Sequence, residues 1–322
     1  MIVILFTGGT ISMRHDPAAQ GAVPALSGRE ILEATRGIED VAQVEIEDWG
    51  AFPGPHMTVE RMWALRNRIR HHLGRDGVQG VVVTHGTDSL EESAYFAARS
   101  LAPDKPIVFT GAMRTASDLG WDGPRNLLDA VRVAASEGAC GYGSMVAMSG
   151  RVFTGLDVTK AHTHLLDAFE SPGLGPVAVI DDGEVIFRRA LVPSMPPLDP
   201  ADPATPVDLV YAAAGADSRL LDASRRDARG MVVAAMGRGN VPPDMVPGIQ
   251  RWVADDKPVV IVSRAQRGRV GPTYGYPGGA RRLVEAGAIL APGRRPQQAR
   301  IDLMLALGLG MDPAGVRALF ES

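Results

Sequence analysis

Cysteine is nearly absent from this chain of 322 residues, in which Cys140 stands alone. A single cysteine makes no internal disulfide, and no cysteines and histidines have the spacing of a zinc site. The sequence therefore predicts a protein of a reducing compartment, with no metal ion and no other cofactor.

Long apolar runs and an excess of basic charge are also lacking. No stretch approaches the roughly 18 apolar residues that a membrane helix needs. The opening apolar run, residues 2–6, is too short for a signal peptide, and no basic segment precedes it. The net charge of -4 and the pI of about 6.0 give no support for nucleic acid or an anionic membrane as a partner. We expect a cytoplasmic protein that binds neither.

What the chain does contain is ordinary for a globular enzyme, with 45% apolar and 22% charged residues. At this length two domains are expected. Proline marks their boundary, because a dense group of prolines makes a stiff, extended linker. The group comprises Pro193, Pro196, Pro197, Pro200, Pro203 and Pro206. We predict an N-terminal domain at residues 1–190, a linker at 191–206 and a C-terminal domain at 207–322.

Short apolar runs alternate with helical segments on both sides of this linker. Before it we expect strands at residues 2–6, 44–47, 81–83, 106–109 and 145–148, and helices at 27–35, 58–73, from 89 onward and at 122–137. After it we expect strands at 207–211, 231–235 and 259–262, and helices at 217–227, 246–253, 280–285 and 297–307. This alternation predicts two α/β domains with mainly parallel sheets.

Two of these helices are predicted to begin with a capping box, in which a serine and a glutamate three residues later satisfy free N–H groups. The pairs are Ser27 with Glu30 and Ser89 with Glu92. Residues 12–26, by contrast, contain no apolar period, so we expect a lid or binding loop there.

The central strand, residues 81–83, runs into a turn rich in functional groups, THGTDS at residues 84–89. The first strand likewise runs into TGGT at residues 7–10. Ligands of open α/β sheets bind at the carboxyl ends of parallel strands, near the point where the strand order reverses. We therefore expect Thr10 and Thr87 to lie in one crevice, which indicates hydroxyl chemistry.

Each of these residues also has a purely structural interpretation. TGGT is either a tight turn or a nucleophile, Thr10, whose glycines admit a substrate and offer main-chain N–H groups to an oxyanion. A dinucleotide loop is disfavoured because GxGxxG is absent. Asp88 either stabilises a helix N-terminus or binds a substrate ammonium. Lys160 is either a solvated surface residue or a partner of Thr87 and Asp88.

Taken together, the motifs resemble those of the bacterial-type L-asparaginase family, asparaginase/glutaminase amidohydrolases with a threonine nucleophile. The two most specific motifs are TGGTI at residues 7–11 and THGTDSLEE at residues 84–92. Further motifs follow in the family's order: TGAMR at 110–114, DGP at 122–124 with NL at 126–127, DVTK at 157–160, GRGN at 237–240 and PQQAR at 296–300. The resemblance covers nearly the whole chain.

The resemblance implies a larger N-terminal domain with a flavodoxin-like parallel sheet, a smaller C-terminal α/β domain, and a homodimer or homotetramer with shared active sites. It implies that Thr10 attacks the side-chain amide carbon and releases ammonia, after which water releases aspartate. Thr87, Asp88 and Lys160 would form a second triad, in which Asp88 also binds the substrate amino group. The implied substrate-binding residues are Gly9, Gly54, Pro55, Gly86, Thr87, Asp88, Ala112 and, from a neighbouring subunit, Asn240.

Three departures from the family's pattern bear on the substrate. Ala22 stands about where the family's mobile loop carries a tyrosine, and His15 is a candidate to replace it. Gly54 stands where a serine usually binds the substrate carboxylate, and residues 274–279 contain no carboxylate where a second subunit usually supplies one. Loss of a general acid–base group costs about 10²–10⁴-fold in rate, and loss of one hydrogen bond to a charged group costs about 1.5–3 kcal/mol.

The sequence therefore leaves three functions open. The first is hydrolysis of L-asparagine to L-aspartate and ammonia. The second is the same mechanism applied to another amide, such as glutamine, D-asparagine or a different small amide. The third is a catalytically weak protein that binds an amino acid without turning it over.

Overall fold

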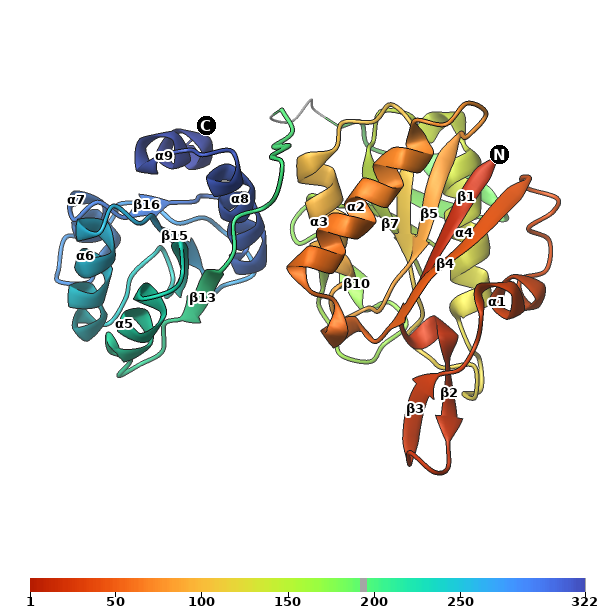
Figure 1. The fold of residues 1–322 in the computed structure, drawn as a ribbon, viewed down its shortest axis with the longest axis horizontal. Coiled ribbons are helices and arrows are strands. Elements are labelled where there is room, and N and C mark those ends of the chain that lie inside the picture. The colour runs from red at the N-terminus through yellow and green to blue at the C-terminus, as the bar shows by residue number, and fades with distance from the viewer. Residues whose placement is uncertain (192–195, 322) are drawn as a thin grey trace. The chain divides into compact units, whose positions relative to one another are not determined.

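The computed structural model describes residues 1–191 and 196–321, so Pro193 of the predicted linker lies outside the described residues. The chain divides into two compact units, Met1–Pro197 and Leu198–Ser322, and each packs helices on a sheet (Figure 1). The linker limits of 191–206 stay a prediction. Within the described ranges, no helix is long and apolar enough to cross a membrane.

An eight-stranded sheet forms the centre of the first unit, in the order β12-β11-β8-β7-β6-β5-β1-β4. The five strands from β7 to β4 pair in parallel, in the flavodoxin-like order that reverses direction between β1 and β5. Three further strands extend this sheet by antiparallel pairing. The strands are β1 (Ile2–Gly8), β4 (Val44–Phe52), β5 (Gly80–Thr84), β6 (Ile107–Thr110), β7 (Ser144–Met148), β8 (Arg151–Thr154), β11 (Ala178–Asp181) and β12 (Glu184–Phe187).

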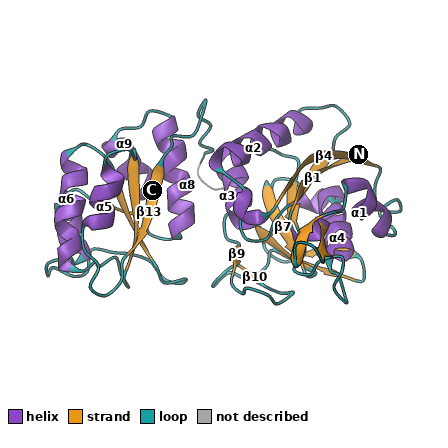
Figure 2. Ribbon diagram, turned by 60° about the horizontal axis from the view of Figure 1, so that its bottom comes forward, coloured by secondary structure: helices purple, strands orange, loops and turns teal. Residues whose placement is uncertain are grey.

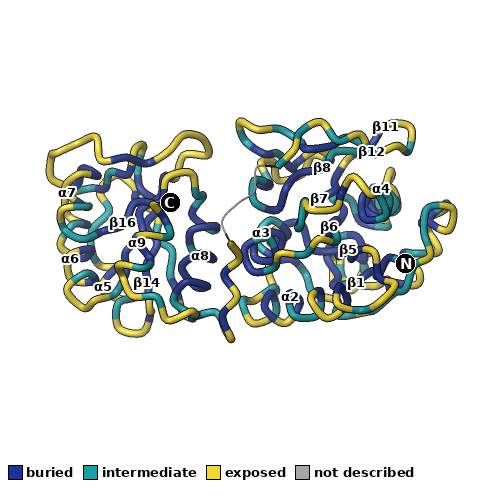
Figure 3. Tube along the Cα trace, turned by 90° about the horizontal axis from the view of Figure 1, so that it is seen from above, coloured by how far each residue is buried: buried dark blue, intermediate teal, exposed yellow. Residues whose placement is uncertain are grey.

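Helices cover both faces of this sheet, with α1 and α4 on one face and α2 and α3 on the other (Figures 1 and 2). Their bounds are α1 (Gly28–Ala34), α2 (Val59–Leu73), α3 (Leu90–Ser100) and α4 (Gly123–Ala135). Along β1, Ile4 joins the core under α1 and α4, whereas Val3 and Leu5 join the core under α2 and α3. Every residue of β1 and β5 is buried, as Figure 3 shows for these strands. Burial on both faces explains their continuous apolar runs.

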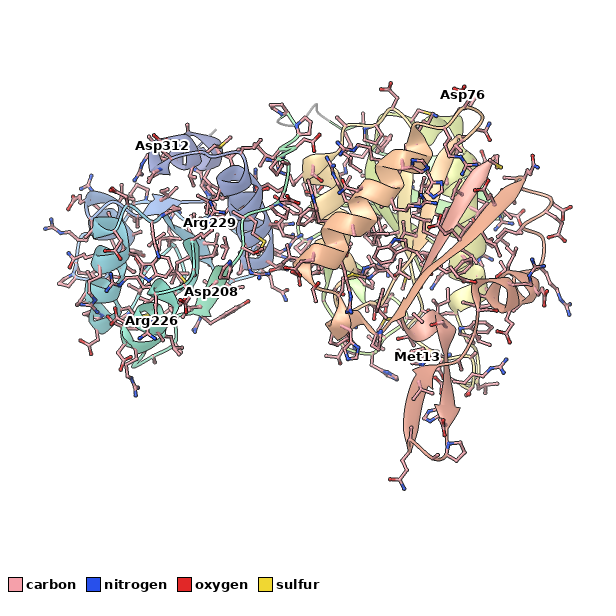
Figure 4. All side chains as sticks on the ribbon, viewed as in Figure 1. Met13, Asp76, Asp208, Arg226, Arg229 and Asp312 are labelled. Carbon is pink, nitrogen blue, oxygen red and sulfur yellow. The ribbon has the colours of Figure 1, made fainter. Side chains whose placement is uncertain are left out.

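The segment at residues 12–26, predicted as a lid or binding loop, contains a β-hairpin. Strand β2 (Met13–Asp16) pairs antiparallel with β3 (Gly21–Pro24), and Met13 lies at the base of the hairpin (Figure 4). The Ala116 main-chain N–H donates to the Met13 carbonyl at 2.9 Å, and the His15 N–H donates to Ser117 Oγ at 3.0 Å. The hairpin itself was not predicted, because its two short strands are at least half exposed and have no apolar period, and the role of the segment as a lid or binding loop stays a prediction.

The two predicted capping boxes have different outcomes. At Ser27 the box is present, since Ser27 Oγ accepts from the Glu30 N–H at 3.3 Å and the Glu30 carboxylate accepts from the Ser27 N–H at 2.8 Å. The box of Ser89 with Glu92 was wrong, because the Ser89 side chain makes no cap hydrogen bond. Ser89 Oγ donates to the Gly54 carbonyl at 2.6 Å instead. A contact between distant segments has displaced the local one.

Strand β4 is the outer strand beside β1, and its glutamates form ion pairs with α2 and the turn after it. Glu47 lies 2.7 Å from Arg68, and Glu45 lies 2.7 Å from Arg75. His72 Nε2 forms a hydrogen bond with the Glu47 carboxylate at 2.8 Å, and burial lowers the pKa of His72. The hydrogen bond from Arg68 holds the pKa of Glu47 below its usual value. This network ties the helix to the open edge of the sheet.

The second unit is built on four parallel strands in the order β13-β14-β15-β16. Leu221, Ile249 and Trp252 pack α5 and α6 against one face, and α8 contacts β13, β14 and β15. The strands are β13 (Val207–Tyr211), β14 (Gly230–Ala235), β15 (Val259–Ser263) and β16 (Ile289–Leu290). The helices are α5 (Arg219–Arg225), α6 (Val246–Ala254), α7 (Ala280–Glu285), α8 (Pro296–Gly308) and α9 (Pro313–Glu321), of which α9 had not been predicted.

His85 follows β5 and is completely buried. Its Nδ1 lies 2.9 Å from the Gly86 carbonyl, which only accepts, so Nδ1 carries the proton. Its Nε2 lies 2.8 Å from Ser93 Oγ and therefore accepts from that hydroxyl. Burial lowers the pKa of His85 to about 4, so the ring is neutral at pH 7.

The buried neutral His85 predicts a loss of stability in acid. As the pH falls below 6.5, His85 binds a proton in the unfolded chain, whereas in the folded protein it stays neutral until about pH 4. Proton binding therefore favours the unfolded chain, and the free energy of unfolding decreases through this window. Between pH 7 and pH 4.5 we expect the free energy of unfolding to fall by about 2–3 kcal/mol more in the wild type than in His85→Asn. Urea unfolding of both proteins at each pH measures this, and the carboxylates common to both cancel. Equal losses in the two proteins would contradict the prediction.

Candidate active site

Three glycines bring the ends of neighbouring strands into contact. Gly9 follows β1, Gly86 lies just beyond β5, and Gly54 begins the short 3-10 helix η2 (Gly54–His56) after β4. A Cβ atom on Gly9 would lie 2.5 Å from Gly86 Cα, and one on Gly86 would lie 2.5 Å from Gly54 Cα. Gly9 also has a φ of 84°, which favours glycine. The main chains pack directly on one another because none of the three residues has a side chain.

Thr10 begins the 3-10 helix η1 (Thr10–Ser12) immediately after this contact. The Ser12 N–H and Ser12 Oγ both donate to the Gly9 carbonyl, at 3.0 and 2.9 Å, and so fix the turn. Thr10 is partly exposed to solvent. The Gly9 N–H donates to the Phe52 carbonyl at 3.0 Å and is therefore not available to an oxyanion. The prediction that both glycines offer such N–H groups was wrong for Gly9.

Thr87, Asp88 and Lys160 meet at the end of β5. Lys160 Nζ donates to Thr87 Oγ1 at 2.9 Å and to Asp88 Oδ1 at 2.6 Å. Thr87 is buried, whereas the Asp88 side chain is 62% exposed and the Lys160 side chain 15% exposed. Because Thr87 accepts from Lys160, its own proton is free to point at another acceptor. The open side of the Asp88 carboxylate can receive a cationic group from solvent.

The structure thus brings the predicted residues of the first unit into one neighbourhood. Gly54 lies against Asp88, since a Cβ atom on Gly54 would be 3.2 Å from Asp88 Cβ, and the adjacent Pro55 is exposed. The Gly9–Gly86 contact joins the Thr10 turn to the strand end that carries Thr87 and Asp88.

Ala112 is buried in the loop after β6, and two residues of α4 and its start hold that loop. The Asp122 carboxylate accepts from the Met113 N–H at 3.0 Å, and Asn126 Nδ2 donates to the Gly111 carbonyl at 3.0 Å. Sequence reasoning read these residues as a helix start and a family motif, and did not assign them this role. In the sequence, the only indication of this loop-binding role was an aspartate and an asparagine four residues apart at the start of a helix.

Asn240 lies in the second unit, in a turn after β14. Its N–H donates to the Met236 carbonyl at 2.9 Å, and its Oδ1 accepts from the Ala280 N–H at 3.2 Å. A single copy of the chain therefore assigns Asn240 a local structural role, and its place in a shared site stays a prediction.

No group of three or more histidine, cysteine, aspartate or glutamate side chains in the described part of the chain is placed to hold a metal ion. His162, near Lys160, uses Nδ1 to accept from the main-chain N–H groups of His164 and Leu165, each at 3.0 Å. The polar groups around Thr87 are hydroxyls, a carboxylate and an amine, which suit nucleophilic and proton-transfer chemistry.

Two family models match the chain over most of its length. Residues 1–193 match the asparaginase N-terminal domain, and residues 206–320 match the glutaminase/asparaginase C-terminal domain. Each match coincides with one run of alternating strands and helices.

Similar proteins match the chain over nearly its whole length. The chain is 38% identical over 322 residues to a probable L-asparaginase of Deinococcus radiodurans, over 99% of this chain and 96% of the relative. It is 32% identical over 307 residues to an L-asparaginase of Bacillus licheniformis, over 95% of each. The crystal structure of a probable cytoplasmic L-asparaginase from Campylobacter jejuni matches with a TM-score of 0.90 at 30% identity, over 100% of this chain and 99% of that one. The chain belongs to the asparaginase family of amidohydrolases.

Proposed function

We propose that this amidohydrolase converts L-asparagine to L-aspartate and ammonia through an acyl-enzyme on Thr10. Family membership supports the reaction. The observation that carries the site assignment is the contact of Lys160 Nζ with both Thr87 and Asp88, beside the Thr10 turn.

In the proposed mechanism, Thr10 Oγ1 attacks the side-chain amide carbon of the substrate. The Thr10 proton is transferred to the departing NH₂ group, which leaves as ammonia, and an ester to Thr10 remains. Water then attacks the ester carbon, the C–O bond to Thr10 breaks, and the hydroxyl recovers a proton as aspartate leaves. A nucleophile of this kind splits one difficult step into two easier ones.

Thr87, Asp88 and Lys160 assist this chemistry as a triad. Lys160 polarises the Thr87 hydroxyl by donating to it, so that the Thr87 proton points toward the reacting groups. Asp88 receives the substrate α-ammonium on its solvent-facing side, where the carboxylate is open. The substrate-binding residues proposed around them are Gly9, Gly54, Pro55, Gly86 and Ala112.

A second amide substrate, such as glutamine, D-asparagine or a different small amide, is the alternative, and Gly54 and Ala22 favour it. Gly54 offers no hydroxyl to a substrate carboxylate, and Ala22 offers no acid–base group. His15 is the direct cross-strand partner of Ala22, so the two side chains project from the same face of the hairpin. This placement supports His15 as the replacement for the missing tyrosine if L-asparagine is the substrate.

We further propose a homodimer or homotetramer in which Asn240 of one copy completes the site of another. The charge distribution supports association between unlike units of two copies. Residues 1–197 contain 24 acidic and 17 basic residues and so have a net charge of -7. Residues 198–322 contain 13 acidic and 16 basic residues and so have a net charge of +3. Tyr274 and Tyr276 stack at a centroid distance of 5.5 Å and are 42% and 50% exposed. Exposed tyrosines of this kind are enriched at subunit interfaces, which supports a contact with another copy.

The cytoplasm is the proposed location. The similarity to the probable cytoplasmic L-asparaginase from Campylobacter jejuni supports this proposal. Cys140 is the sole cysteine, which fits a reducing compartment.

Removal of the nucleophile tests the proposed reaction. We expect ammonia release from L-asparagine to fall by more than about 10³-fold in Thr10→Ala, because the hydroxyl that forms the proposed ester is removed. Thr10→Ser keeps a hydroxyl at that position and should retain measurable turnover. L-glutamine and D-asparagine are assayed beside L-asparagine. Turnover of none of the three by the wild type, with binding of L-aspartate by calorimetry, would favour the binding protein over the enzyme.

Substitution of Gly54 tests how the substrate carboxylate is bound. Gly54→Ser adds a hydroxyl beside Asp88, and we expect KM for L-asparagine to fall about 10-fold relative to Gly54→Ala. Both variants add the same Cβ atom, which lies 3.2 Å from Asp88 Cβ and displaces its neighbours slightly, so their ratio isolates the hydroxyl. Equal KM values would show that the carboxylate lies elsewhere and would favour a different amide.

Mixed oligomers test the shared site. Oligomers made only of Thr10→Ala, or only of Asn240→Ala, should be poorly active, because every one of their sites lacks one of the two residues. If sites are shared, co-expression should restore activity, since some sites then receive neither substitution. Light scattering should give the mass of a dimer or tetramer. A fully active monomer, or no recovery from two inactive variants that do associate, would contradict the shared site.

A further inference from the structure

Lys160 lies on a very short strand. β9 (Thr159–Lys160) has two residues and pairs with β10 (Phe169–Glu170) in a two-stranded sheet separate from the main one. So short a pair does little to fix the main chain of Lys160 relative to β5. Yet the Lys160 ammonium must keep its contacts with Thr87 and Asp88, which lie more than seventy residues earlier.

Helix α3 supplies the missing anchor. Glu91, in its first turn, accepts the main-chain N–H of Lys160 on Oε2 at 2.5 Å. Thr87 and Asp88 lie just before the same helix, separated from it by Ser89, and accept from Lys160 Nζ. The start of α3 therefore binds both ends of Lys160, its main chain through Glu91 and its ammonium through the catalytic pair.

A second contact places the approach to Lys160 on the same helix. A Cβ atom on Gly155 would lie 2.7 Å from the Ala94 carbonyl, so the chain leaving β8 rests on α3. Ala94 lies three residues after Glu91, one turn further along. The segment at residues 155–160 thus follows α3 from Ala94 back to its N-terminus.

We propose that Glu91 is a positioning residue that holds Lys160 over Thr87 by binding the Lys160 main chain. This role rests on the proposed function of the Lys160 ammonium. A carboxylate that accepts an N–H forms a strong, short hydrogen bond. A shift of about 1 Å in a reacting group can cost about 10²-fold in rate. Because both ends of Lys160 bind one helix, their geometry is kept when other parts of the unit move.

Two substitutions separate the hydrogen bond from the charge. Glu91→Gln keeps an acceptor for the Lys160 N–H, whereas Glu91→Met has a similar length and no acceptor. We expect kcat for L-asparagine to fall about 10–100-fold in Glu91→Met and less than about 5-fold in Glu91→Gln, with KM within about 3-fold of wild type in both. Glu60→Gln, which neutralises an exposed carboxylate in the first turn of α2, is the control and should leave both constants unchanged.

Deuterium exchange of the peptide that contains Lys160 gives a readout independent of activity. We expect faster exchange in Glu91→Met than in wild type or Glu91→Gln, at an equal fraction of folded protein. Full kcat and unchanged exchange in Glu91→Met would overturn the positioning role, as would equal losses in both Glu91 variants. An inactive wild type, or an active Lys160→Met, would count against the proposed function, while the exchange result would still decide whether Glu91 holds Lys160.

Discussion

Direct packing of main chain on main chain at Gly9, Gly86 and Gly54 is the constraint on which the site depends. A Cβ atom added to Gly9 would lie 2.5 Å from Gly86 Cα, and one added to Gly86 would lie 2.5 Å from Gly54 Cα. The contact joins the ends of β1 and β5, where the parallel strand order reverses, to the segment after β4. Any side chain at Gly9 or Gly86 would push these strand ends apart and separate the Thr10 hydroxyl from the groups after β5.

Charge in this neighbourhood is confined to a few groups. Lys160 and Asp88 form an ion pair that reaches solvent, whereas His85, directly before Gly86, has a pKa of about 4 and is neutral at physiological pH. Its two hydrogen bonds, to Gly86 and Ser93, are made within a buried setting. The histidine therefore supports the backbone that carries Thr87 without adding a second positive charge beside it.

The sequence predicted features that depend on nearby residues and missed those that depend on distant ones. The capping box at Ser27 formed as expected, because both partners lie within one helical turn. Ser89 had the same local pattern, but its hydroxyl donates to the carbonyl of Gly54, 35 residues earlier in the chain, and not to the helix N-terminus. The parallel strands β1, β5, β6 and β7 were found from their apolar runs, whereas the antiparallel strands β8 and β11 and the exposed hairpin were not predicted. Spacing also could not place Lys160 beside Thr87; the family motif alone suggested it.

The ion pairs on β4 have a consequence for the protein in concentrated solution. Among the described residues β4 is the last strand of the sheet, and an edge strand is where a strand from another molecule could pair. Glu45 and Glu47 place carboxylates along this strand, and Arg68 and Arg75 add cations beside them. A foreign strand would have to displace or desolvate these charges to dock. The same contacts that fasten α2 to the sheet therefore protect the edge against aggregation.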